Sequence, residues 1–170
     1  MNTRMITKVI GGTMAVAGTA VISAIIKNRR DLKKVLEKER KLLVISEEYI
    51  DALKITSERG REGWEKTQAT LDMQYVCYKV NQIGFSTTLD TNCNDMTTQL
   101  VSPASKKAGD EARNVMLGLM CLSKVCVHLC ESARNGSDAE YEMCLRAFNN
   151  DLKEFEDAIE LLRSHLDCFK

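Results

Sequence analysis

The C-terminal stretch of this 170-residue chain carries the pattern that most constrains its fold. Between Tyr141 and Phe169, apolar residues are spaced alternately four and three residues apart without a break. In an α-helix this spacing places them on one narrow seam, as in helices that pack lengthwise against a partner helix. We therefore predict a C-terminal helix with a coiled-coil-grade seam, made of Tyr141, Leu145, Phe148, Leu152, Phe155, Ile159, Leu162, Leu166 and Phe169.

The residues before this helix predict a helical hairpin. Ser137 and Glu140 have the spacing of a capping box, which opens a helix. Asn135-Gly136 should end the preceding helix, with the glycine in the left-handed conformation. That helix should begin with Ser102 as cap and Pro103 in the first position. Because the connection is short, we expect the two helices to be antiparallel. The fold class predicted is all-α: an antiparallel helical bundle or coiled-coil hairpin behind an N-terminal membrane helix.

The N-terminal region contains an uncharged run from Val9 to Ile26, bracketed by Lys8 and Lys27. As a helix these residues extend about 27 Å, close to the hydrocarbon thickness of a bilayer. Gly, Ala, Thr and Ser make the run only moderately apolar, so a buried helix of a soluble protein is the alternative. We expect a membrane anchor whose apolar side chains are Val9, Ile10, Val16, Val21, Ile22, Ile25 and Ile26.

Small residues recur on one face of the same run. Gly11, Ala15 and Gly18 would let two membrane helices approach closely, because bulky side chains hold helices apart. These three residues are therefore candidates for helix association within the membrane. Alanine-rich helices also produce such spacing by chance.

A basic stretch follows the run directly. Residues 27–41 hold eight basic and three acidic side chains, a net charge of +5, whereas the whole chain is neutral. Lipid headgroups are the expected contact for Lys27, Arg29, Arg30, Lys33 and Lys34. The positive-inside rule then places the rest of the chain on the cytoplasmic side. That remainder is net acidic, which does not favour nucleic-acid binding.

The pattern along the chain predicts three regions: a membrane anchor at 1–27, a charged helical stalk at 28–63, and a helical bundle at 64–170. Gly60 and Gly63 predict a hinge near 57–63, with one continuous helix as the alternative. Residues 86–101 lack periodicity and should form a loop. The core of the bundle should contain Trp64, Leu71, Val115, Leu119, Leu122, Leu129, Leu145, Phe148, Leu152, Phe155, Ile159 and Leu162, and Tyr75 and Tyr78 share the apolar stripe of Trp64.

The residues that carry chemistry do not form a recognisable catalytic motif. Cys126 and Cys130 lie on the opposite side of a helix from His128, so one metal ion could not bind all three without unwinding the helix. His165 has no carboxylate three or four residues away on its own helix. The seven cysteines fit a reducing compartment. We therefore expect no enzyme activity, catalytic residue, metal, cofactor or small-molecule substrate.

The expected function is that of a membrane-anchored helical interaction protein: a tether, adaptor or regulator. The moderately apolar anchor with basic flanks resembles the signal anchors of mitochondrial outer-membrane proteins. In plan, the chain also resembles phage inner-membrane spanins, which implies a membrane-disrupting, lysis-type or pore-forming role as one alternative. A soluble helical-bundle effector or inhibitor is another.

The end of the C-terminal seam is the candidate surface for a protein partner or a second copy of the chain, which would make a homo-oligomer. Opposite it, the preceding helix starts with small residues, so bulky side chains there lack an obvious intrachain cover. The candidates are Ile159, Leu162, Leu166 and Phe169. The alternative is that Trp64 or Leu71 covers them within the chain.

Overall fold

The computed structural model describes the backbone of residues 3–85, 88–90, 99–101 and 109–170, and the side chains of residues 26–68, 74–85 and 109–170. Over these ranges the chain forms five helices and one short two-stranded sheet. In order they are α1 (Thr3–Glu58), α2 (Gly60–Lys66), α3 (Ala69–Gln82), β1 (Thr88–Asp90), β2 (Gln99–Val101), α4 (Asp110–Asn135) and α5 (Asp138–Asp167). The predicted all-α helical bundle is confirmed.

The chain divides into two compact units, Met1–Glu37 and Lys38–Lys170. Helix α1 contributes to both, because it runs from the first unit into the second without a break. The sequence-based division placed the start of the bundle at residue 64. The structure instead groups Lys38–Glu58 with the bundle, where Leu42, Tyr49 and Leu53 are buried.

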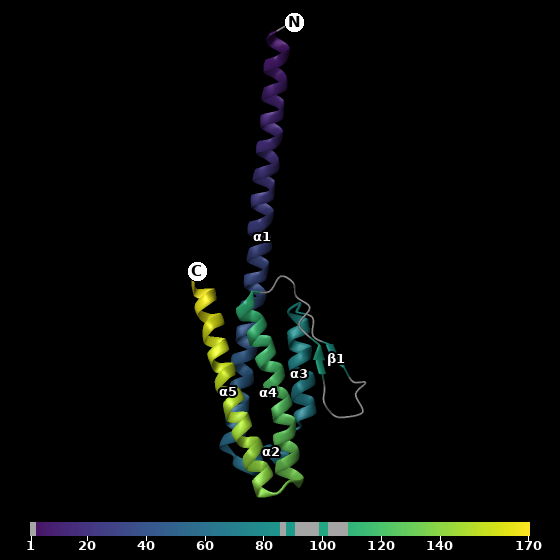
Figure 1. The fold of residues 1–170 in the computed structure, drawn as a ribbon, viewed down its shortest axis with the longest axis vertical. Helices are drawn as coiled ribbons and strands as arrows, with labels where there is room; N and C mark the ends of the chain where they lie inside the picture. The colour runs from purple at the N-terminus through teal and green to yellow at the C-terminus, as the bar shows by residue number, and fades with distance from the viewer. Residues whose placement is uncertain (1–2, 86–87, 91–98, 102–108) are drawn as a thin grey trace. The chain divides into compact units, whose positions relative to one another are not determined.

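The bundle unit consists of α3, α4, α5 and the second part of α1 lying side by side (Figure 1). Glu47 and Lys54 of α1 pair with Arg163 and Glu156 of α5, which fixes these two helices as antiparallel. Helices α4 and α5 pack along each other as the predicted antiparallel hairpin (Figure 1). The short helix α2 lies at the end of the bundle where α4 and α5 are joined.

Apolar side chains from α1, α2, α4 and α5 meet in one core. Trp64 is fully buried and its indole meets Phe148 edge to face, with 4.9 Å between ring centroids. The predicted core is confirmed for most residues whose side chains are described, and only Leu145 and Leu152 are half-buried. The confirmed members are Trp64, Val115, Leu119, Leu122, Leu129, Phe148, Phe155, Ile159 and Leu162.

Gly118 sets the spacing of the α4–α5 hairpin. The ring of Phe155 lies directly over it, so a Cβ at this position would be 2.6 Å from Phe155 Cδ2. Phe155 is buried in this contact. The missing side chain on α4 therefore makes room for a large ring on α5.

The ends of α4 differ from the sequence prediction. The described helix starts at Asp110 with Gly109 as its cap, and the predicted start at Ser102 and Pro103 lies outside the described residues. At the other end, Gly136 is extended, with φ of −84°, so the predicted left-handed conformation is wrong. Its backbone carbonyl accepts a hydrogen bond from Arg61 instead. The capping box of Ser137 and Glu140 is confirmed.

The predicted hinge near 57–63 is confirmed as a sharp break between α1 and α2. Gly60 adopts a φ of +62°, which L-residues with side chains rarely adopt. Arg59 precedes it, and α2 then brings Trp64 into the core.

Helix α3 buries a different face from the one predicted. Tyr75 and Tyr78 are 51 % and 60 % exposed, so their assignment to the core is wrong. Val76, Cys77 and Val80 are buried in their place. A break at Thr67–Gln68 separates Trp64 from α3, so the period that links Trp64 to Tyr75 in the sequence does not continue along one helix. The side chain of Leu71 lies outside the described residues.

Part of the predicted loop at 86–101 forms a small sheet. Thr88–Asp90 and Gln99–Val101 pair antiparallel, with Leu89 opposite Leu100. The other residues of the predicted loop lie outside the described ranges.

Candidate functional site

The predicted anchor falls on residues whose side chains the structure does not describe, except for Ile26, which is exposed. This range includes Gly11, Ala15 and Gly18. The backbone is helical through the whole run. The candidate headgroup-binding residues are all described and exposed: Lys27, Arg29, Arg30, Lys33 and Lys34.

Among the residues whose side chains the structure describes, one helix is long and apolar enough to cross a membrane, α4 (Asp110–Asn135). Half of its most apolar stretch is buried inside the bundle. The central helix of a water-soluble bundle has the same composition, so length and apolarity are weak evidence that α4 crosses a membrane.

The candidate partner surface at the end of α5 is largely covered by the chain itself. Ile159, Leu162 and Leu166 are at most 4 % exposed, and only Phe169 is open to solvent, at 44 %. The cover does not require Leu71, since α1 lies beside this part of α5. Residues 38–58 belong to the predicted stalk. They form the part of α1 that lies beside this part of α5.

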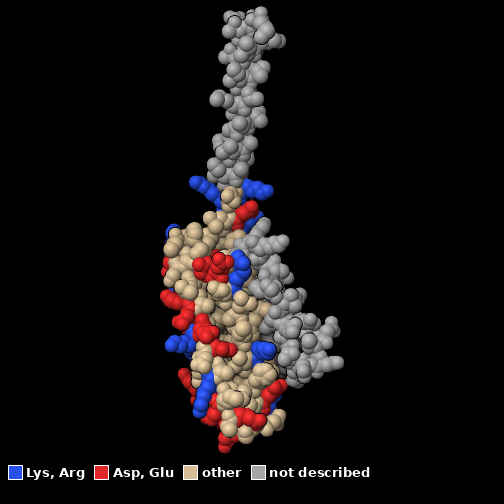
Figure 2. All heavy atoms as spheres, in the orientation of Figure 1, with Lys and Arg blue, Asp and Glu red and all other residues tan. Residues whose placement is uncertain are grey.

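Acidic and basic side chains are mixed over the visible face of the bundle unit (Figure 2). Between α1 and α5, Lys54 pairs with Glu156 at 2.5 Å and Glu47 with Arg163 at 2.6 Å. The hydrogen bond that Lys54 donates to Glu156 raises the pKa of Lys54, and the one that Arg163 donates to Glu47 raises the pKa of Arg163. These ion pairs are exposed to solvent, which is typical of the solvated face of a helix.

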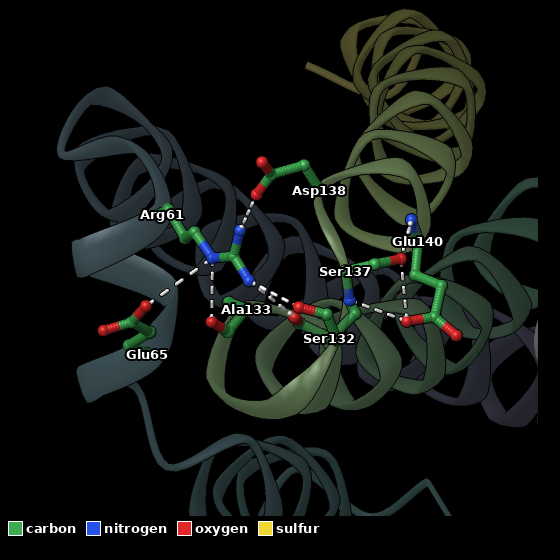
Figure 3. Close-up of polar contacts among 8 residues, drawn as sticks. Arg61, Glu65, Ser132, Ala133, Ser137, Asp138 and Glu140 are labelled. Carbon is green, nitrogen blue, oxygen red and sulfur yellow. Dashed lines mark hydrogen bonds and ion pairs between the residues drawn. The ribbon is translucent and has the colours of Figure 1, made fainter.

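Arg61 organises the end of the bundle where α4 and α5 join (Figure 3). Its guanidinium donates to the carbonyls of Ala133, Ser132 and Gly136, over 2.9, 3.4 and 2.7 Å. It also pairs with Asp138 and lies 5.3 Å from the centroid of the Tyr141 ring. One cation thus binds backbone carbonyls at the end of α4 and in the residue that follows it.

Arg134 of α4 does the same for α2. It donates to the carbonyls of Glu65 and Thr67 over 2.8 and 2.7 Å. Arginines from two helices therefore satisfy carbonyls at each other's ends. These hydrogen bonds hold α2 to the end of α4, so this end of the bundle is a structural joint.

At the opposite end, a buried carboxylate from α1 caps α4. Glu39 is 1 % exposed, and its Oε1 accepts a hydrogen bond from the Gly109 backbone N–H at 2.9 Å. A carboxylate at a helix N-terminus also interacts favourably with the helix dipole. The second oxygen, Oε2, is buried and has no hydrogen-bond partner among the described residues.

His165 of α5 lies between this carboxylate and a second one. Its Nε2 is 3.7 Å from Glu39 Oε2, and its Nδ1 is 4.0 Å from Glu111 Oε2 on α4. No carboxylate lies three or four residues from His165 along α5, as the sequence indicates, and the two carboxylates near its ring come from α1 and α4. The cluster of Glu39, Glu111 and His165 joins three helices, and no signal within α5 could have revealed it.

In the described part of the chain, the side chains with metal-binding or nucleophilic chemistry lie apart from one another except in the cluster at His165 and in the pair of His128 and Glu131. Within the described ranges, no three His, Cys, Asp or Glu residues gather in an arrangement that could hold a metal ion. Of the described cysteines, Cys77, Cys126 and Cys130 are buried, and Cys121 and Cys168 are exposed. His128 is exposed on α4, 3.7 Å from Glu131.

An open groove of 400 Å³ lies between α1 and α3. Its walls include Ile45, Ala52, Tyr75 and Val76. The walls are mostly apolar and offer few polar groups to orient a bound molecule. No protein-family model, curated protein or solved structure matches this chain.

Proposed function

We propose that this chain is a non-enzymatic, membrane-anchored interaction protein. The run from Val9 to Ile26 crosses the membrane, the basic side chains after it contact lipid headgroups, and the helical bundle faces the cytoplasm to meet a protein partner or a second copy. Tether, adaptor and regulator are the roles this plan allows.

One observation carries the proposal: a spanning-length uncharged run is followed at once by exposed basic side chains on the same helix. Helix α1 includes the run and the basic stretch without interruption. Lys27, Arg29 and Arg30 are exposed, so no packing inside the protein accounts for them. Exposed basic side chains just outside a hydrocarbon core favour anionic headgroups by about 1 kcal/mol each.

A non-enzymatic role is supported by how the polar side chains are used. Arg61 and Arg134 are bound to backbone carbonyls, and Glu39 caps a helix. His165 lies between two carboxylates. These side chains hold helices together. Their structural use supports an interaction protein over an enzyme.

The anchor is tested by alkaline carbonate extraction of membranes from cells that express the full chain. We expect the parent protein to stay in the membrane pellet. Val16→Arg places a charge at the middle of the run and should cost about 2.5–3.5 kcal/mol of insertion free energy. That variant should shift to the supernatant.

Val44→Arg is the matched control. Val44 is 52 % exposed on the bundle part of α1, so the same substitution there should leave the pellet fraction unchanged. A parent protein that carbonate extracts completely would overturn the anchor and favour the soluble effector or inhibitor. An extracted Val44→Arg variant would show that the assay reports folding and not insertion.

A further inference from the structure

The cluster of Glu39, Glu111 and His165 places an imidazole ring between a buried carboxyl group and a half-buried one. The side chain of His165 is 30 % exposed, so protons from water reach it. Histidine is the side chain that ordinarily gains or loses its charge between pH 5 and 8. The two carboxylates face opposite nitrogens of one ring, so a charged imidazolium would interact with both.

Three charged side chains close to the cluster in sequence have partners of their own. Arg40 of α1 donates to the carbonyl of Phe169 at 3.5 Å. Asp110 of α4 pairs with Arg113, and Asp167 of α5 pairs with Lys170. The basic side chain that pairs with the buried oxygen of Glu39, at 3.7 Å, is that of His165.

A buried carboxylate oxygen without a hydrogen bond is costly unless a positive charge lies close by. The Gly109 N–H satisfies only Oε1 of Glu39. When His165 is neutral, Oε2 loses the charge that compensates its burial. The packing of the end of α5 against α1 and α4 is then less stable.

We propose that Glu39, Glu111 and His165 form a pH-sensitive latch that holds the last turn of α5 against α1 and α4. The latch is closed when His165 is protonated and loosens when it is neutral. Phe169 follows this last turn, and its ring meets His165 edge to face at 5.2 Å, so loosening also frees an apolar side chain. The latch does not depend on membrane attachment.

Hydrogen exchange of the full chain in a mild non-ionic detergent tests the latch. Exchange is followed by mass spectrometry at pH 6 and pH 8 and corrected for the intrinsic pH dependence of amide exchange. For peptides covering residues 163–170, we expect protection to fall about fivefold from pH 6 to pH 8, the factor for an ion pair worth about 1 kcal/mol.

His165→Gln should abolish this pH dependence, since glutamine keeps a polar side chain without a titrating charge. His128→Gln is the matched control: it removes the chain's other histidine, which pairs with Glu131 on the exposed face of α4, and should behave as the parent does. Glu39→Gln should abolish the dependence if it folds, and circular dichroism checks that.

Two results would overturn the latch. One is a parent protein whose last turn is equally protected at both pH values. The other is a His165→Gln variant that keeps the parent's pH dependence. Neither depends on whether Glu39→Gln folds, so the proposal is decided by His165 alone.

Discussion

The bundle needs the second part of α1, Lys38–Glu58, to fold on its own. We predict that a fragment of residues 38–170 folds, whereas one of residues 64–170 does not form a stable native state. The shorter fragment keeps α3, α4, α5 and only the last three residues of α2, and it lacks Lys38–Glu58. The sequence alone had favoured 64–170 as the folding unit.

The magnitude follows from the buried side chains that the shorter fragment loses. Leu42, Tyr49, Ile50 and Leu53 are each at most 7 % exposed. Burying a large apolar side chain contributes about 1.5–3 kcal/mol, so the four together contribute about 6–12 kcal/mol. Whole domains are stable by only about 5–15 kcal/mol, so most or all of the stability is lost.

Circular dichroism and urea denaturation of the two fragments measure this directly. Residues 38–170 should give a helical spectrum and one cooperative transition. Residues 64–170 should aggregate or unfold without a cooperative transition. If both fragments unfold at the same urea concentration, α1 is not part of the core and this account of the bundle is wrong.

Two substitutions test finer details. Gly118→Ala should lower the free energy of unfolding by about 1–3 kcal/mol, because its Cβ would overlap the ring of Phe155, and an unchanged midpoint of thermal denaturation would contradict that packing. Glu140→Gln tests the capping box: the Ser137 backbone N–H lowers the pKa of Glu140 below its ordinary 4.5, so the carboxylate contributes stability above that pH and loses it as the pH falls through the lowered pKa. The stability difference between the parent and Glu140→Gln should therefore shrink between pH 6 and pH 3 in thermal denaturation, and a constant difference would exclude this role.

Local patterns predicted the parts of the fold that local chemistry determines. The seam from Tyr141 to Leu166 is buried or half-buried as its spacing indicated, because a 4-3 repeat permits one packed face only. The capping box of Ser137 and Glu140 forms because its partners are three residues apart. Gly60 broke the helix where the sequence had placed a hinge.

The features that the sequence did not reveal depend on residues far apart in the chain. Glu39 caps α4 from 70 residues away, and Arg61 satisfies carbonyls of α4 more than 70 residues away. The buried face of α3 also could not be predicted, since the break after Trp64 changes the register of its apolar positions. These features depend on tertiary contacts, which the spacing of apolar residues within one helix cannot predict.

Glycosylation mapping in microsomes tests most directly whether the chain spans a membrane with its bundle in the cytoplasm. Asn135-Gly136-Ser137 is a native acceptor sequence, and Asn135 is exposed at the end of α4. A second acceptor is added ahead of Met1. We predict that only the added N-terminal site is glycosylated when the full chain is translated with microsomes. Glycosylation at Asn135 would reverse the orientation, and glycosylation at neither site would contradict a membrane-spanning anchor.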